Sequence, residues 1–267
     1  VPDTLDAEIV RDAARFLEDG EKMQLSYAIQ NTHRTVGTRV SSHIVKNFGM
    51  RNTLQPDHLT VHLKGSAGQS LGAFAAPGLK LEVSGDANDY VGKGLSGGTI
   101  VVRPPMASPL RACKNTIIGN TVLYGATDGF LFAAGRAGER FAVRNSGASV
   151  VIEGCGSNGC EYMTGGVAVI LGSIGANFGA GMTGGMAYLY DPEGDAQSLM
   201  NHETLVTCPV TTAHWERQLK MLVERHHAET GSVRADQILQ HWDLEVKNFV
   251  QVCPIEMLNK IPHPLGI

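Results

Sequence analysis

The segment GDANDYVGKGLSGGTIVV, residues 85–102, is the most informative about the fold because it joins a glycine motif to a strand-like run. Gly92, Gly94 and Gly97 have the G-x-G-x-x-G spacing of a dinucleotide-binding turn. That turn needs a helix directly after the glycines and an acidic residue about 20 positions further on. Here the β-branched run 99–102 follows, and no acidic residue occurs at that distance. We therefore expect the glycines to shape the backbone, and a nucleotide-binding protein is the weaker alternative.

The same glycine pattern occurs a second time, in the same register, in GSIGANFGAGMTGG at 172–185. Weaker copies begin at Gly65, Gly135 and Gly154, and apolar runs follow them. In all, 26 of the 32 glycines lie between Gly65 and Gly185. Such self-similarity is typical of repeat architectures, in which each short unit buries its apolar face against its neighbours.

This repeat predicts an all-β-dominated fold, a right-handed parallel β-helix in a glycine-rich solenoid, with flanking α-helices at both ends. Glycine is expected where the coil turns, because it tolerates a positive φ and a close backbone approach. The glycines predicted to have this structural role are Gly65, Gly68, Gly72, Gly85, Gly92, Gly94, Gly97, Gly98, Gly135, Gly138, Gly172, Gly175, Gly179, Gly181, Gly184 and Gly185.

The chain is divided by composition into a helical collar or linker at 1–59, the parallel β-helix at 60–191 and a helical tail at 192–267, which together make one structural unit. Outside the repeats, hydrophobic periodicity predicts helices at 3–19, 39–48, 211–227 and 234–242, a strand at 23–29, and a last helix or extended arm at 244–252.

Composition excludes several classes of partner. The formal net charge of -4 and the pI near 6.2 give no reason to expect nucleic acid or a membrane as a partner. The sequence has neither a signal peptide nor a long apolar run, so we expect a cytoplasmic protein. An odd set of cysteines favours reduced thiols over a disulfide framework. These are Cys113, Cys155, Cys160, Cys208 and Cys253.

Candidate catalytic and metal-binding residues do not form a convincing set. His62 stands alone before the repeats, and acidic residues are scattered along them. Cys155 and Cys160 lack the further ligands of a zinc or cluster site. We predict no catalytic, cofactor-binding or metal-binding residue in this chain, and a surface role for His226 and His227. Arg34 is left open between a partner contact and a local cap. An independent β-helix enzyme acting on a carbohydrate or acyl substrate is the alternative function.

Several long strings resemble the glycine-rich C-terminal domain of the large subunit of bacterial glutamate synthases, and the likeness spans about 3–252. They are THRTVGT at 32–38, GSAGQSLGAF at 65–74, the segment 85–105, the segment 115–148 and EGCGSNGCEYMTGG at 153–166. Because the chain begins at Val1 and not at Met, we expect a fragment or a processed product.

The resemblance implies a multidomain enzyme that makes two L-glutamate from L-glutamine and 2-oxoglutarate with electrons from NADPH or ferredoxin. It implies an amidotransferase domain and an FMN-binding barrel with an iron–sulfur cluster elsewhere in the large subunit, and a small NADPH-oxidising subunit as a further partner. In such enzymes this domain carries no catalytic group, so it is expected to be a scaffold without a cofactor of its own.

Overall fold

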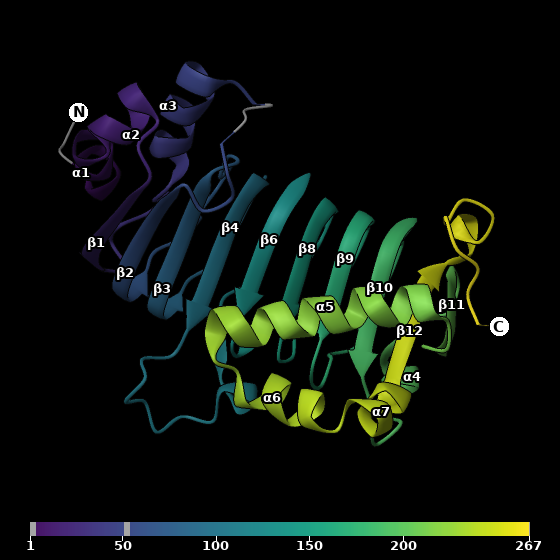
Figure 1. The fold of residues 1–267 in the computed structure, drawn as a ribbon. Coiled ribbons are helices and arrows are strands. Elements are labelled where there is room, and N and C mark those ends of the chain that lie inside the picture. The colour runs from purple at the N-terminus through teal and green to yellow at the C-terminus, as the bar shows by residue number, and fades with distance from the viewer. Residues whose placement is uncertain (1–3, 51–53, 267) are drawn as a thin grey trace.

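The computed structural model describes residues 4–50 and 54–266. Within them, twelve strands join in one sheet whose main path runs β1-β2-β3-β4-β6-β8-β9-β10-β12-β11 (Figure 1). The strands are β1 (Met23–Ile29), β2 (Leu59–Ala67), β3 (Leu79–Ala87), β4 (Ser96–Arg103), β5 (Thr116–Ile118), β6 (Asp128–Ala133), β7 (Arg136–Ala137), β8 (Ser146–Ile152), β9 (Thr164–Ile170), β10 (Gly184–Tyr190), β11 (Leu205–Pro209) and β12 (Phe249–Pro254).

Helices cover parts of this sheet. Figure 1 shows α1 to α3 beside the first strands and α5 lying across the middle strands. The helices are α1 (Leu5–Asp12), α2 (Ala14–Asp19), α3 (Thr38–Phe48), α4 (Ala196–Leu199), α5 (Ala213–Thr230), α6 (Val233–Gln240) and α7 (Trp242–Glu245). Short 3-10 helices occupy Ala112–Lys114, Val246–Asn248 and Ile255–Met257.

The sequence repeat determines how the strands pair. Neighbouring strands from β1 to β10 on the main path run parallel, and the start of one glycine repeat lies beside the start of the next, with Gly65 opposite Gly85. The last strands differ, because β12 is antiparallel to both β10 and β11. Equivalent positions of the repeat are therefore neighbours in space.

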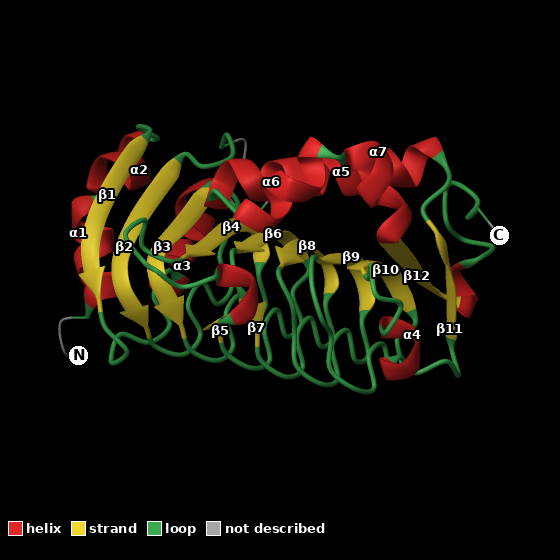
Figure 2. Cartoon of the chain, turned by 90° about the horizontal axis from the view of Figure 1, so that it is seen from below, coloured by secondary structure: helices red, strands yellow, loops and turns green. Residues whose placement is uncertain are grey.

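The connections between the parallel strands stack as well. The Tyr90 N–H donates to the Asn120 carbonyl, and the Leu123 N–H donates to the Val91 carbonyl, each at 2.8 Å. Within each connection the chain repeatedly adopts positive φ, at glycine and also at other residues such as Tyr90 and Leu123. These connections form the row of loops on the side of the sheet away from α5 in Figure 2.

Both faces of the sheet are apolar, so alternate residues of a strand belong to different core layers. In β4, the side chains of Ile100 and Val102 pack with the interior of the connections, while Val101 lies in the layer beneath α5. The apolar stripe of α5 is buried in this second layer; it consists of Trp215, Leu219, Leu222 and Val223.

The prediction of an all-β-dominated right-handed parallel β-helix is wrong. The structure is a mixed α/β fold with one open, mostly parallel sheet, and the described residues form no β-helix solenoid. The physical reason lies in the connections. They consist largely of hydrogen-bonded turns in which positive φ recurs, where a solenoid would need further ladders of strand, and only β5 and β7 are strands there. Helices α5 to α7 also cover a face of the sheet and do not merely cap its end.

Individual elements agree better with the sequence. The strand at 23–29 is confirmed as β1, and the helix at 39–48 is α3. The segment 3–19 forms two helices that meet at Ala13, and Asp3 lies outside the described residues. The arm at 244–252 contains a helical turn and then β12. The division at 59 and 191 stays a prediction.

Candidate functional site

The glycine motif at 92–97 does not form a dinucleotide-binding turn. It spans the end of the connection between β3 and β4 and the start of β4, which begins at Ser96. A helix N-terminus, which would supply N–H groups to a pyrophosphate, is therefore replaced by a strand at this position. The N–H groups of Gly92 and Gly94 instead donate to the carbonyls of Leu71 and Tyr124, each at 2.9 Å.

The structural glycines meet two kinds of neighbour, backbone and side chain. A Cβ at Gly85, where φ is +155°, would collide with the Gly65 carbonyl oxygen of the neighbouring strand. A Cβ at Gly92, where φ is +66°, would lie 2.8 Å from Cδ2 of Leu123, which is the end of a side chain. Of the predicted set, those with φ in the left-handed region are Gly65, Gly72, Gly85, Gly92, Gly94, Gly97, Gly135, Gly179, Gly181 and Gly185. The others, with less than 3.0 Å of room for a Cβ, are Gly68, Gly98, Gly138, Gly172, Gly175 and Gly184.

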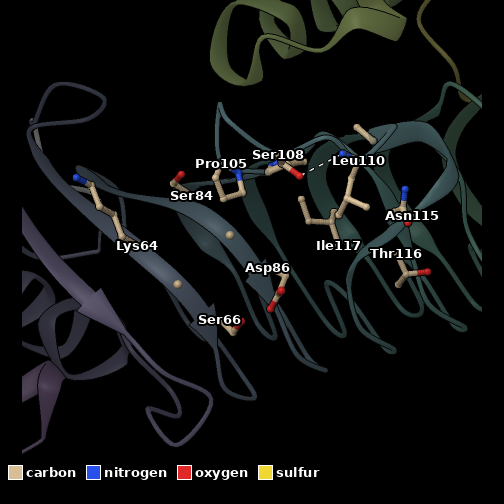
Figure 3. A pocket seen from close by; sticks show the side chains of 14 residues that line it. Lys64, Ser66, Ser84, Asp86, Pro105, Ser108, Leu110, Asn115, Thr116 and Ile117 are labelled. Atoms are coloured by element: carbon tan, nitrogen blue, oxygen red, sulfur yellow. Dashed lines mark hydrogen bonds between the residues drawn. The ribbon is translucent and has the colours of Figure 1, made fainter.

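A cavity of about 450 Å³ lies where the loop between β4 and β5 crosses β2 and β3 (Figure 3). Its floor includes Gly65 and Gly85, which present bare backbone. Lys64 and Asp86 line different sides of it, and Asp86 is the one carboxylate among the residues that line this cavity. A lone carboxylate and a lone ammonium do not supply the paired acid and base that hydrolysis of a glycosidic bond requires.

A second cavity, of about 210 Å³, contains three carboxylates from one short loop: Asp191, Glu193 and Asp195. The Asp191 carboxylate accepts hydrogen bonds from the N–H groups of Asp195 and Ala196, at 3.0 and 3.1 Å. Glu193 and Asp195 are exposed. Asp191 thus holds the turn before α4, and the three side chains do not come from different elements to meet at one point.

The prediction of a surface role for His226 is wrong, because its side chain is fully buried. It lies on the sheet face of α5, with Nε2 3.7 Å from Oε1 of Glu153, and that Glu153 oxygen also accepts a hydrogen bond from Ser232. Burial lowers the pKa of His226, and the Glu153 carboxylate opposes this shift. His227, one position further, is partly exposed and its Nδ1 lies 3.1 Å from the Ser232 carbonyl. This cluster ties α5 and α6 to the end of β8.

Cys155 and Cys160 are buried side chains inside the connection between β8 and β9. Burial raises the pKa of Cys155 to about 12 and raises that of Cys160 well above its usual value. A thiol with such a pKa is protonated at neutral pH, and a nucleophile must be a thiolate. Across the described ranges, 4–50 and 54–266, no group of three or more His, Cys, Asp or Glu side chains could hold a metal ion.

A groove of about 600 Å³, which the sequence analysis does not predict, runs along the connections. It is lined by Arg34, Gln69, Ser70, Tyr90, Lys93, Thr121, Tyr124 and Arg140. Arg34, which was left open between a partner contact and a local cap, therefore lies in this groove. The lining residues come from similar positions of several connections, some of which contribute two, so aligning the repeats, and not only their glycines, would have revealed the groove.

The chain belongs to the GXGXG motif family, whose model matches residues 6–255. Over all 267 residues it is 64% identical to the glutamate synthase (NADPH) large chain of Azospirillum brasilense, a match that covers 100% of this chain and 18% of that protein. It is 44% identical over 239 residues to the glutamate synthase (NADPH) large chain of Bacillus subtilis, covering 89% of this chain and 16% of that one.

A third relative is the ferredoxin-dependent glutamate synthase of Pyropia yezoensis, 52% identical over 228 residues, which are 85% of this chain and 15% of the relative. The resemblance drawn from the sequence strings is thus confirmed. The chain spans less than a fifth of the length of these relatives, so other domains of a large chain are implied. No helix among the described residues is long and apolar enough to cross a membrane.

Proposed function

We propose that this chain is a non-catalytic scaffold segment of a glutamate synthase large chain, the enzyme that makes two L-glutamate from L-glutamine and 2-oxoglutarate. The observation that carries the proposal is the match along the whole chain to a segment of such enzymes, at 64% identity. The buried polar groups support it, because Glu153, Ser232 and Asn145 hold elements of the fold in place.

The chemistry then belongs to the rest of the large chain. We expect the amidotransferase domain and the FMN-binding domain with its iron–sulfur cluster to lie outside these residues, and a small subunit to oxidise NADPH. The chain is similar to both NADPH-dependent and ferredoxin-dependent enzymes, so we expect the other domains to determine which electron donor is used. NADPH is the donor we propose, because the relative with 64% identity is named for it.

The test uses the full-length large chain and removes the polar side chains of the main cavity. Lys64→Ala and Asp86→Ala should leave kcat, FMN content and Tm close to the parent values, as should Asp243→Ala, an exposed control on α7. A fall in kcat of about a hundredfold with Tm and FMN content unchanged would show that this segment supplies a catalytic group.

A further inference from the structure

The most exposed aromatic side chains of the described residues all lie on the connections that stack along one side of the sheet. Phe74, Tyr90, Tyr124 and Tyr162 have exposed fractions of 54, 41, 39 and 52%. They come from four separate connections, which places them in a row and not in one local cluster. Aromatic rings bury large areas and are concentrated in interfaces, so a row of exposed rings marks a contact surface.

Two of these rings pack against glycine residues of the neighbouring connection. A Cβ at Gly94 would run into the Phe74 ring, and a Cβ at Gly181 would lie 2.5 Å from the Tyr162 ring. Backbone hydrogen bonds fix the arrangement, because the Phe74 N–H donates to the Lys93 carbonyl at 2.8 Å and the Tyr162 N–H donates to the Ala180 carbonyl at 2.9 Å. The second glycine of each G-x-G thus leaves room for a ring that the preceding connection exposes to solvent.

Cationic side chains lie along part of the same row, although the whole chain carries -4 and Arg140 also pairs with Glu161 at 3.8 Å. Arg34, Lys93 and Arg140 line the groove of about 600 Å³, and no carboxylate is among the residues that line it. The Lys93 ammonium lies 6.0 Å from the centroid of Tyr90. Further along, the Arg144 guanidinium lies 5.9 Å from the centroid of Tyr162. Arginine and aromatic side chains together are typical of interface hot spots.

We infer that this aromatic and cationic row is the surface on which an acidic part of the same large chain docks. The inference rests on the proposed function, since it takes the remainder of a glutamate synthase large chain as the partner. That remainder is most of the polypeptide, because this chain covers 18% of its Azospirillum relative. A second copy is the poorer occupant, because a symmetric contact of the row with itself would place cations against cations.

Photo-cross-linking of the full-length large chain tests the proposal. Benzoylphenylalanine in place of Tyr124 should cross-link within the same polypeptide, to a peptide rich in Asp and Glu from outside this segment. The same probe in place of Leu244, which is 66% exposed on α7, is the matched control and should not reach that peptide. A cross-link between two copies, a cross-link only to this segment, or the absence of any cross-link overturns the proposal.

Charge reversal in the cross-linking protein separates docking from mere proximity. Lys93→Glu with Arg140→Glu should lower the yield of the Tyr124 cross-link by about tenfold, because it places carboxylates opposite an acidic partner. Lys247→Glu, at an exposed position after α7, should leave the yield unchanged. An unchanged yield of the Tyr124 cross-link in the double variant overturns the proposal that the partner is acidic. The scaffold role is judged separately, by kcat of the Lys64→Ala and Asp86→Ala variants.

Discussion

The glycine-rich strand ends and the glycine-rich turns use the same residue for different reasons. At the strand ends, Gly85 of β3 packs against the backbone of the neighbouring strand β2, at the carbonyl oxygen of Gly65. In the turns, Gly92 and Gly179 face side-chain atoms of Leu123 and Leu205. Backbone cannot move without breaking the ladder, while a side chain can adopt another rotamer.

Non-glycine residues at equivalent turn positions support this distinction. The row of turn positions that contains Gly92 and Gly179 also contains Leu123, Ala142 and Cys160, with φ of 59°, 57° and 56°. The turn therefore accepts a Cβ in the left-handed region wherever the neighbouring turn leaves room. Glycine is therefore indispensable at a strand end, whereas a turn position can be occupied by glycine or by another residue.

The largest effect is expected for Gly85→Ala. The added Cβ would meet the Gly65 carbonyl oxygen, so β2 and β3 would have to separate or the ladder would have to shift. We expect a loss of about 4 kcal/mol or more in the free energy of unfolding, measured by urea denaturation. A loss of about 1 kcal/mol would show that the strand end is as adaptable as a turn.

An intermediate effect is expected for Gly179→Val. Its φ of +74° is unfavourable for a β-branched residue, and the Cβ would lie 2.5 Å from Cδ1 of Leu205. We expect a loss of about 3 kcal/mol, and a smaller loss for Gly179→Ala, which adds no branch. If the two variants unfold at the same urea concentration, side-chain crowding does not determine the cost at this position.

A smaller effect is expected for Gly125→Ala, in which conformation alone changes. Gly125 has φ of +66°, and a Cβ there would meet nothing within 4 Å. The expected loss is about 1 kcal/mol, the cost of holding an alanine in the left-handed region. Thermal unfolding of the Gly125→Ala and Gly85→Ala variants, measured side by side, tests this expected loss. Equal melting temperatures for the two variants would remove the distinction between strand ends and turns.

Cys160 provides a test without a change in stability. It fills a turn position that is glycine elsewhere, and burial raises its pKa well above the usual value. At pH 8 its thiol should react with an aromatic disulfide reagent more slowly than the half-buried Cys113, by about a hundredfold or more. Equal rates would mean that this turn opens readily.

The sequence was sufficient for elements whose signals are local. The alternating run at 23–29 and the glycine repeat identified strands that the structure contains. It was insufficient for β12, because its partners β10 and β11 are distant in sequence and periodicity left a helix or an arm open. The open sheet was missed because the glycine-rich connections between strands have a similar composition whether they form further strands or turns.

The residues of the candidate surface were missed for a related reason. Tyr90 and Thr121 adopt positive φ, which their residue types do not predict. Their conformation follows from stacking on the neighbouring connection, so it is a property of the assembled repeat. The buried position of His226 is likewise set by β8 and α6, which its own helix does not reveal.

The most direct test is a double-mutant cycle between neighbouring turns, with Gly92→Ala, Leu123→Ala and the two combined. Cδ2 of Leu123 lies 2.8 Å from the place a Cβ would take at Gly92, so truncating the leucine should make room for the alanine. We predict that Gly92→Ala costs at least about 1 kcal/mol less when Leu123 is already alanine. Strict additivity of the two losses would contradict it, because glycine would then be needed at this turn for its backbone alone.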